Sequence, residues 1–183
     1  MEGKYKNKFR IDTARFRASD YSEDGYYLVT ICCQNRKSYF GKISEKRMNL
    51  SKIGEFAESC WKEIPKHFPF VILDGFIVMP NHLHGIILID KEHCHETKFV
   101  ETQNLASLRN TKGFGPQSQN LASIIRGFKI GVKNLCRENN LYFQWQERFH
   151  DHIIRNDIEL ENMRRYIRDN LANWNRDRNN PDK

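Results

Sequence analysis

The spacing of apolar and polar residues divides the chain into short strands and amphipathic helices. The run over 26–33, Tyr-Tyr-Leu-Val-Thr-Ile-Cys-Cys, is aromatic and β-branched, which is typical of a largely buried strand. Two further apolar runs, 70–79 and 83–89, are separated by Pro80 and Asn81, which are common turn residues. These two runs therefore predict an antiparallel hairpin.

Three segments carry apolar residues at helical spacing. In 50–64 the apolar residues recur every three or four positions, Ser51 can cap the start, and Pro65 is expected to end the helix. The same period extends over four turns in 118–139, which is the clearest helix of the chain. A final helix is expected from about residue 157 to residue 174, with acidic residues near its positive end.

The order of these elements indicates the fold class. A fourth strand is expected over 148–155, and Asp74-Gly75 is expected to form a β-bulge, because a turn there would leave the first arm of the hairpin too short. Strand, helix, hairpin, helix, strand and helix follow one another along the chain. This order predicts an α+β fold: a ferredoxin-like (RRM-like) antiparallel sheet with helices packed on one face, plus a C-terminal helix.

The chain has room for one domain. Its 183 residues are close to the usual domain length of about 150. We expect a basic N-terminal arm over 1–24, a single domain over 25–175 and a polar tail over 176–183. Residues 90–117 are rich in Gly, Pro, Gln, Asn and Ser without periodicity, which predicts a long surface loop.

Charge and composition narrow the classes of partner and compartment. Thirty Lys and Arg residues against 23 Asp and Glu residues give a net charge of +7, which favours polyanionic partners such as nucleic acids. No apolar run approaches the roughly 18 residues of a membrane span, and the first ten residues are basic and polar, so we expect a cytoplasmic protein that does not enter a membrane. The five cysteines include no CxxC pair, which is typical of reduced core thiols.

A stripe of basic side chains follows one side of the 118–139 helix. Its members are spaced by three, four and four positions: Arg126, Lys129, Lys133 and Arg137. Such a stripe suits a phosphate backbone, and an ordinary solvated helix face is an equally good interpretation.

Two groups of residues could carry chemistry. Strand alternation places His82 and His84 on one face with Leu83 on the other, so the two imidazoles could share a divalent ion or form a structural hydrogen-bonded pair. Tyr166 and Asn170 lie four residues apart at the edge of the apolar stripe of the last helix, where both can face one groove. A tyrosine in this place could also simply close the core.

These residues stand in an order that resembles a known family. The run MPNHLHGIILI (79–89), followed much later by YIRDNLANW (166–174), resembles the single-tyrosine HUH transposases, and among them the REP-associated tyrosine transposases of bacteria. The segments 21–41 and 150–156 share the resemblance, which spans most of 20–175.

The resemblance implies a site and a reaction. It implies that His82 and His84 hold a divalent ion, Mg²⁺ or Mn²⁺, with Asn170 as the third ligand and Tyr166 as the nucleophile. The implied reaction is metal-dependent cleavage and transfer of single-stranded DNA near hairpin-forming repeat elements, through a 5'-phosphotyrosine. Leu171 stands where the family commonly has proline, so the helix can continue past Asn170.

The sequence also suggests how subunits and DNA are arranged. The tyrosine-bearing helix lies near the chain end, which favours a monomer whose tyrosine acts in cis over a homodimer. The residues expected to bind DNA are the four of the basic stripe and three further arginines: Arg155, Arg165 and Arg168.

Two alternatives remain at this stage. The first is a non-catalytic module of ferredoxin-like fold that binds single-stranded nucleic acid, although no RNP-type aromatic pattern is present. The second is a zinc protein whose ligands come from His93-Cys94-His95-Glu96 or from His150-Asp151-His152.

Overall fold

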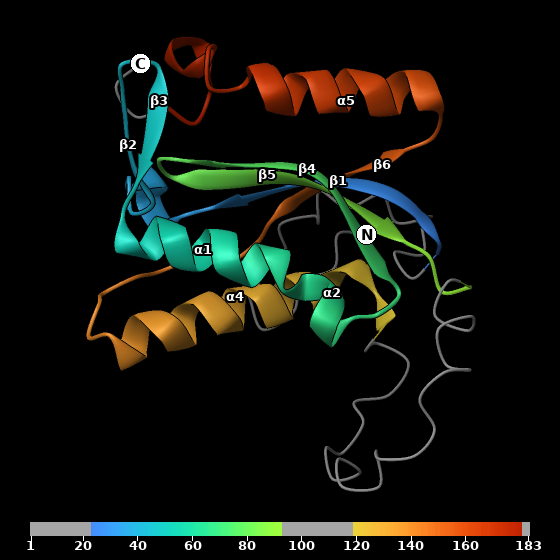
Figure 1. Ribbon diagram of the computed structural model, residues 1–183, viewed down its shortest axis with the longest axis horizontal. Coiled ribbons are helices and arrows are strands. Elements are labelled where there is room, and N and C mark those ends of the chain that lie inside the picture. Colours follow the sequence, from blue (N-terminus) through green and yellow to red (C-terminus); the bar gives the residue numbers. More distant parts are fainter. Residues whose placement is uncertain (1–22, 93–118, 181–183) are drawn as a thin grey trace, which may run out of the picture.

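A four-stranded antiparallel sheet forms the centre of the molecule (Figure 1). The computed structural model describes residues 23–92 and 119–180, so most of the predicted arm, most of the predicted long loop and the 93–96 cluster lie outside the described residues. The strands stand in the spatial order β4-β5-β1-β6. Their bounds are Gly25–Cys32 for β1, Val71–Met79 for β4, His82–Ile89 for β5 and His150–Ile154 for β6.

Helices cover both faces of this sheet. α1 (Lys52–Lys62) and α4 (Leu121–Glu138) lie together on one face, and α5 (Asp157–Asp169) lies across the other (Figure 1). The chain order β1-α1-β4-β5-α4-β6, with β4 and β5 joined by the predicted Pro80–Asn81 turn, gives the ferredoxin-like arrangement. The α+β prediction, with a separate C-terminal helix that carries the tyrosine, is confirmed.

The helix starts follow from local capping. The Ser51 side chain accepts a hydrogen bond from the first turn of α1, and Asn120 and Ser123 form a capping box at the start of α4. α1 ends at residue 62, before Pro65. That proline lies in the first turn of a short helix, α2 (Ile64–His67), where its missing N–H has no cost. The sequence predicts that helical structure ends at Pro65, whereas a second helix includes this residue.

The larger apolar core lies between the sheet and the pair α1 and α4. Trp61 is fully buried, and its ring meets that of Phe128 edge-on with 5.3 Å between the centroids. The indole also lies directly on β5, because a Cβ atom on Gly85 would come within 2.2 Å of it. Only glycine permits this approach, so the core supports β5 from behind between His84 and Ile86.

The predicted β-bulge is present in β4. The pairing of β4 with β5 shifts between Leu73 and Phe76, so that Asp74 and Gly75 together lie opposite Ile86. The bulge therefore presents a carboxylate and a glycine at the level of one residue of the neighbouring strand.

A two-stranded sheet, β2 (Gly41–Ser44) paired with β3 (Arg47–Leu50), is not predicted by the sequence. Its turn residues Glu45 and Lys46 have φ angles of 52° and 58°, in the left-handed region that hairpin turns of this kind require. Asparagine and glycine usually occupy such positions. Glutamate and lysine therefore give no turn signal, and strands this short give no clear alternation.

The last helix ends earlier than predicted. α5 stops at Asp169, and the carbonyl of that residue accepts hydrogen bonds from both the backbone and the side chain of Asn173. A short 3₁₀ turn, η4 (Trp174–Arg176), follows. The residues after it belong to the predicted polar tail, yet they pack against the sheet, and Asn179 is buried.

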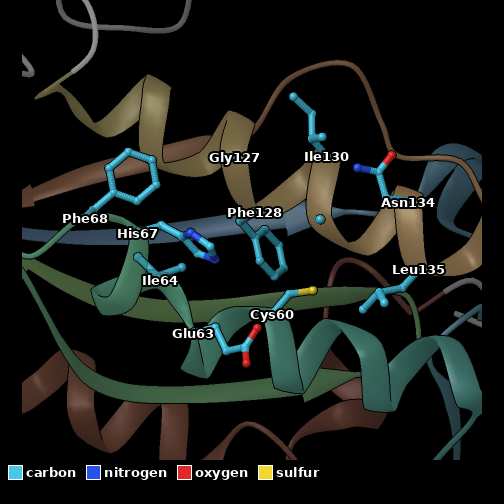
Figure 2. A pocket seen from close by; sticks show the side chains of 11 residues that line it. Cys60, Glu63, Ile64, His67, Phe68, Gly127, Phe128, Ile130, Asn134 and Leu135 are labelled. Carbon is cyan, nitrogen blue, oxygen red and sulfur yellow. The ribbon is translucent and has the colours of Figure 1, made fainter. Parts of the chain in front are cut away.

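A groove opens on the side of the sheet away from α5 (Figure 2). It has a volume of about 490 Å³, lies between α1, α2 and α4, and is lined largely by apolar side chains such as Phe68 and Ile130.

Another short 3₁₀ turn, η1 (Gln34–Arg36), follows β1. Within 23–92 and 119–180, no helix combines the length and the apolar character needed to cross a membrane.

Candidate active site

The interface between the sheet and α5 has an apolar part and a polar part. The apolar part is a small cluster of four buried side chains: Ile86, Ile154, Leu160 and Ile167. Farther along β5 toward the Pro80–Asn81 turn lie His84 and His82, which are 2% and 0% exposed. The alternation predicted for this strand is thus confirmed, and both imidazoles lie on the face that α5 covers.

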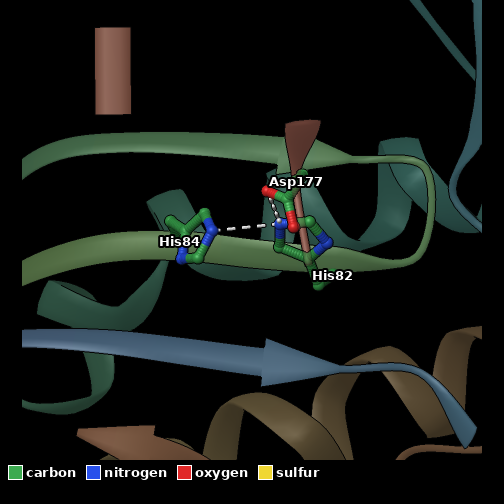
Figure 3. Close-up of side chains that lie close together, drawn as sticks. All are labelled: His82, His84 and Asp177. Atoms are coloured by element: carbon green, nitrogen blue, oxygen red, sulfur yellow. Dashed lines mark hydrogen bonds and ion pairs between the residues drawn. The ribbon is translucent and has the colours of Figure 1, made fainter. Parts of the chain in front are cut away.

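The two imidazoles face one another through the same ring nitrogen. The Nε2 atoms of His82 and His84 lie 3.0 Å apart (Figure 3). Two ligands in adjacent positions of one ion, each about 2.1 Å from it, are separated by about 3.0 Å. The spacing therefore fits two ligands of a single cation.

Hydrogen bonds determine which nitrogen of His82 carries the proton. The Asn81 amide nitrogen donates to the backbone oxygens of Arg36 at 2.9 Å and Asn179 at 2.7 Å, which turns its oxygen toward His82. His82 Nδ1 lies 2.8 Å from that oxygen and must donate to it. The lone pair of Nε2 is left to bind a cation, in the manner of histidine ligands oriented by an outer partner.

His84 is oriented in a similar way by the neighbouring strand. Thr30 of β1 lies opposite His84 in the sheet, and its hydroxyl is 2.8 Å from Nδ1. A hydroxyl can donate or accept, so Thr30 can serve either tautomer. Burial, the larger cause, lowers the pKa of both His82 and His84 to about 3, so both rings are neutral at pH 7, as metal ligands must be.

Asp177 completes a group of three possible ligands. One ligand atom each from His82, His84 and Asp177 lies within 4.8 Å of the others, and Asp177 Oδ2 is 3.8 Å from His82 Nε2 (Figure 3). The sequence does not predict this residue, because it lies after the last helix in a segment without periodicity. The turn η4 brings it back to the sheet.

Tyr166 joins the same site from α5. Its hydroxyl lies 3.2 Å from His84 Nε2 of the same chain, and its side chain remains 44% exposed. Burial raises the pKa of the phenol and the Asp177 carboxylate adds to this, while the Asn170 amide and the Arg178 charge act in the opposite direction. Tyr166 is therefore protonated at pH 7 and must release its proton if it is to act as a nucleophile.

Asn170 lies one helical turn after Tyr166, as the sequence predicts. It is 3% exposed, and its side-chain oxygen is buried with no hydrogen-bond partner among the residues that the structure describes. Leaving such an oxygen unpaired costs about 1–3 kcal/mol. Asn170 lines the same pocket as Tyr166 and Asp177, and a buried amide oxygen without a partner is a ligand type that divalent cations bind, so these residue types fit the expected metal.

A cationic pocket of about 550 Å³ lies beside the nucleophile. Tyr166, Asn170 and Asp177 line it, and so do three arginines: Arg165, Arg176 and Arg178. Arg165 is thus one of the predicted DNA-binding residues that the structure places next to Tyr166.

The predicted basic stripe lies on the other layer of the molecule. Arg126, Lys133 and Arg137 are exposed on α4, across the sheet from α5 (Figure 1). Lys129 is engaged within the protein, because its ammonium donates to the backbone oxygens of Gln146 and Arg148 at 2.7 and 3.1 Å. Burial lowers its pKa to about 8. The structure therefore does not bring this stripe together with the histidines.

The other predicted residues lie on or near α5. Arg168 is exposed, and its Nη2 atom lies 3.6 Å from Glu161 Oε1. Arg155 precedes the helix, and its backbone N–H donates to the Glu159 carboxylate. His152 contacts the same Glu159 at 2.6 Å. Within the described ranges, the single group of three or more possible metal ligands is the one at His82, so the 150–152 triplet forms no site there.

Known proteins are similar to this chain in sequence and in fold. No family model matches the chain. An uncharacterized protein of Haemophilus influenzae is 37% identical over 164 residues, which make up 89% of each protein. A second protein of that organism, provisionally named a REP-associated tyrosine transposase, is 27% identical over 153 residues, 81% of this chain and 70% of that protein.

A solved structure has the same fold. It is that of a REP-associated tyrosine transposase bound to a REP hairpin, and it matches with a TM-score of 0.58 at 19% identity over 87% of this chain and 73% of that one. The paired histidines and the helix-borne tyrosine lie together in this fold. In sequence and in fold, the chain is similar to REP-associated tyrosine transposases over most of its length.

Proposed function

We propose that this protein is a metal-dependent single-strand DNA endonuclease and strand transferase that cuts next to DNA hairpins with Tyr166. One observation carries the proposal: the Tyr166 hydroxyl lies 3.2 Å from Nε2 of His84 within one chain. A nucleophile and a candidate metal ligand that meet in this way can act on the same phosphate.

The proposed step exchanges one phosphodiester for another. The Tyr166 oxygen forms a bond to phosphorus, and the bond from phosphorus to the 3'-oxygen of the preceding nucleotide breaks. The phenol loses its proton, and the departing 3'-oxygen gains one. The products are a 5'-phosphotyrosine and a free 3'-hydroxyl, so a later 3'-hydroxyl can reverse the step without a nucleotide cofactor.

His82, His84, Asn170 and Asp177 would hold the cation, which we expect to be Mg²⁺ or Mn²⁺. When bound, such an ion would polarise a phosphate oxygen as a Lewis acid. The contribution of the chain is orientation: Asn81 and Thr30 fix the ring planes, and burial keeps both imidazoles neutral.

Single-stranded DNA suits this site better than a duplex. A phosphate must be reached in line from one side, which an unstacked strand permits. Arg165 and Arg178 line the pocket beside Tyr166, where they can bind phosphates that flank the cut. The solved relative binds a REP hairpin, which supports a hairpin-bearing substrate here.

The test is formation of a covalent adduct. Purified protein is incubated with Mn²⁺ and with single-stranded oligonucleotides that carry one hairpin and varied flanks. We expect a protein–DNA band that survives denaturation, is absent with EDTA, and is absent in Tyr166→Phe.

A matched control is Tyr142→Phe, because Tyr142 is an exposed tyrosine that does not line the pocket at Tyr166. This variant should form the adduct as the wild type does. If the wild type binds the hairpin DNA tightly but forms no adduct on any flank, the non-catalytic binding module replaces the proposal.

A further inference from the structure

We infer that Asp74 is a positioning residue for Tyr166, acting through its ion pair with Arg164. The inference rests on the proposed function, because it concerns how the nucleophile is held. It assigns a role to the β-bulge of β4, which the catalytic chemistry itself does not use.

The contact between Asp74 and Arg164 has two points. Arg164 Nε lies 3.1 Å from Asp74 Oδ1, and Arg164 Nη2 lies 2.6 Å from Asp74 Oδ2. A planar guanidinium bound to both oxygens of a carboxylate allows little rotation or sliding. The Asp74 side chain is 19% exposed, so water screens this pair less than a fully exposed one.

The bulge is what directs this carboxylate to α5. Asp74 and Gly75 lie together opposite Ile86, whose side chain belongs to the apolar cluster under α5. A Cβ atom on Gly75 would lie 3.9 Å from Ile167 of α5, so Gly75 also faces this helix. The Gly75 backbone N–H donates to Asp74 Oδ1 at 2.6 Å and holds the carboxylate in place.

The helix needs such a contact because its apolar anchoring is small. Of its residues, Leu160 and Ile167 are buried. Tyr166 is 44% exposed, and its ring meets the His84 ring edge-on with 5.2 Å between the centroids. Arg164 stands two residues before Tyr166 and three before Ile167. A contact at Arg164 together with the packing of Ile167 sets both the height and the rotation of α5 over His84.

The experiment separates positioning from binding. Single-turnover adduct formation at saturating hairpin DNA and hairpin affinity are measured for the wild type, Asp74→Ala and Asp74→Glu. Because a displacement of about 1 Å can cost about 100-fold in rate, we expect Asp74→Ala to form the adduct about 100-fold more slowly. Its affinity for the hairpin should stay within about 2-fold, and Asp74→Glu should recover at least part of the rate.

The matched control is Glu58→Ala, which removes an ion pair of similar length, 2.8 Å to Lys62, from the other face of the molecule. An Asp74→Ala rate equal to that of Glu58→Ala would overturn the inference. Should the wild type form no adduct, the proposed function fails instead, and amide hydrogen exchange across 157–169 then decides the role of Asp74. Faster exchange in Asp74→Ala supports its hold on α5, and unchanged exchange overturns it.

Discussion

The two faces of the sheet differ in what they bury. The face under α1 and α4 carries the large apolar core, in which the ring of Trp61 meets that of Phe128 and the ring of Phe40 meets that of Trp145. The face under α5 carries a much smaller apolar cluster. The buried polar residues of the described ranges all lie around the histidines, on the α5 face or in segments packed against it: Thr30, Asn81, His82, His84, Asn170 and Asn179.

This difference separates stability from chemistry. Burial of apolar area on the first face stabilises the sheet, and the second face can therefore bury polar groups at a cost that the first one offsets. β5 contributes to both faces. Trp61 packs against Gly85 on the first face, and the neighbours of Gly85 in the strand, His84 and Ile86, lie on the α5 face. Substitutions on the α5 face should therefore lower the reaction rate and leave stability nearly unchanged. Substitutions on the α1 and α4 face should lower stability and leave the rate nearly unchanged.

The largest effect is expected on the α5 face. His84→Ala removes one of the two proposed imidazole ligands, and the loss of about 4 kcal/mol of transition-state stabilisation corresponds to about a thousandfold slower adduct formation. The variant should remain folded, because the core across the sheet is untouched. The measurement is the single-turnover adduct rate with Mn²⁺, together with the circular dichroism spectrum.

His67→Ala is the matched control, since His67 is an exposed histidine beside the groove on the other face. It should form the adduct at the wild-type rate. A His84→Ala variant that still reacts at a rate close to that of His67→Ala would remove the histidine pair from the mechanism.

Trp61→Ala is expected to lower stability and to leave the adduct rate nearly unchanged. Because Trp61 is fully buried between α4 and β5, its truncation should lower the free energy of unfolding by about 3–5 kcal/mol, measured in urea. At temperatures where the variant is folded, its adduct rate should stay within about 3-fold of the wild type. Tyr142→Ala, at a position that is 68% exposed, is the control and should change stability by less than about 0.5 kcal/mol.

Sequence patterns predicted those features of the α5 face that depend on periodic spacing of residues. Alternation along β5 placed His82 and His84 on one face, and helical spacing placed Tyr166 and Asn170 together. The bulge at Asp74-Gly75 was predicted because a turn there left too short an arm.

Features that depend on an irregular backbone could not be predicted in this way. Asp177 reaches the histidines only because α5 ends at Asp169 and the chain turns back, and no repeat in the sequence signals that reversal. The β2–β3 turn uses Glu45 and Lys46 at positive φ, against their usual preferences. Helical spacing alone also placed Lys129 in the basic stripe, although its ammonium binds two carbonyls.

A smaller effect is expected from the pH dependence of the Asp74–Arg164 pair. The hydrogen bonds to Arg164 hold the pKa of Asp74 below its ordinary value of 3.8, so the ionised pair stabilises the fold fully above that pH and ceases to do so as the pH falls through the lowered value. The stability difference between the wild type and Asp74→Asn should be about 0.5–1 kcal/mol at pH 7 and should shrink below pH 4. Glu161 Oε2 lies 3.7 Å from Nη1 of the same Arg164 guanidinium, so Glu161 is kept as glutamate in both proteins.

The measurement is urea unfolding of both proteins from pH 7 to pH 3. Glu58→Gln serves as the control, because it disrupts an exposed pair on α1. A difference between the wild type and Asp74→Asn that grows as the solution is acidified would contradict the assigned direction of the pKa shift.

The smallest effect concerns whether DNA reaches the α4 layer at all. Lys133 is exposed there, and each phosphate contact on a single strand contributes about 0.7 to the slope of log affinity against log salt. If a bound DNA strand continues from Tyr166 around the sheet to α4, Lys133→Ala should lower that slope by about 0.7. The slope is measured by fluorescence anisotropy over about 50 to 300 mM salt. Lys62→Ala, an exposed and paired lysine on α1, should leave the slope unchanged. An unchanged slope in Lys133→Ala would confine DNA binding to the α5 face, and the basic side of α4 would then be an ordinary solvated surface.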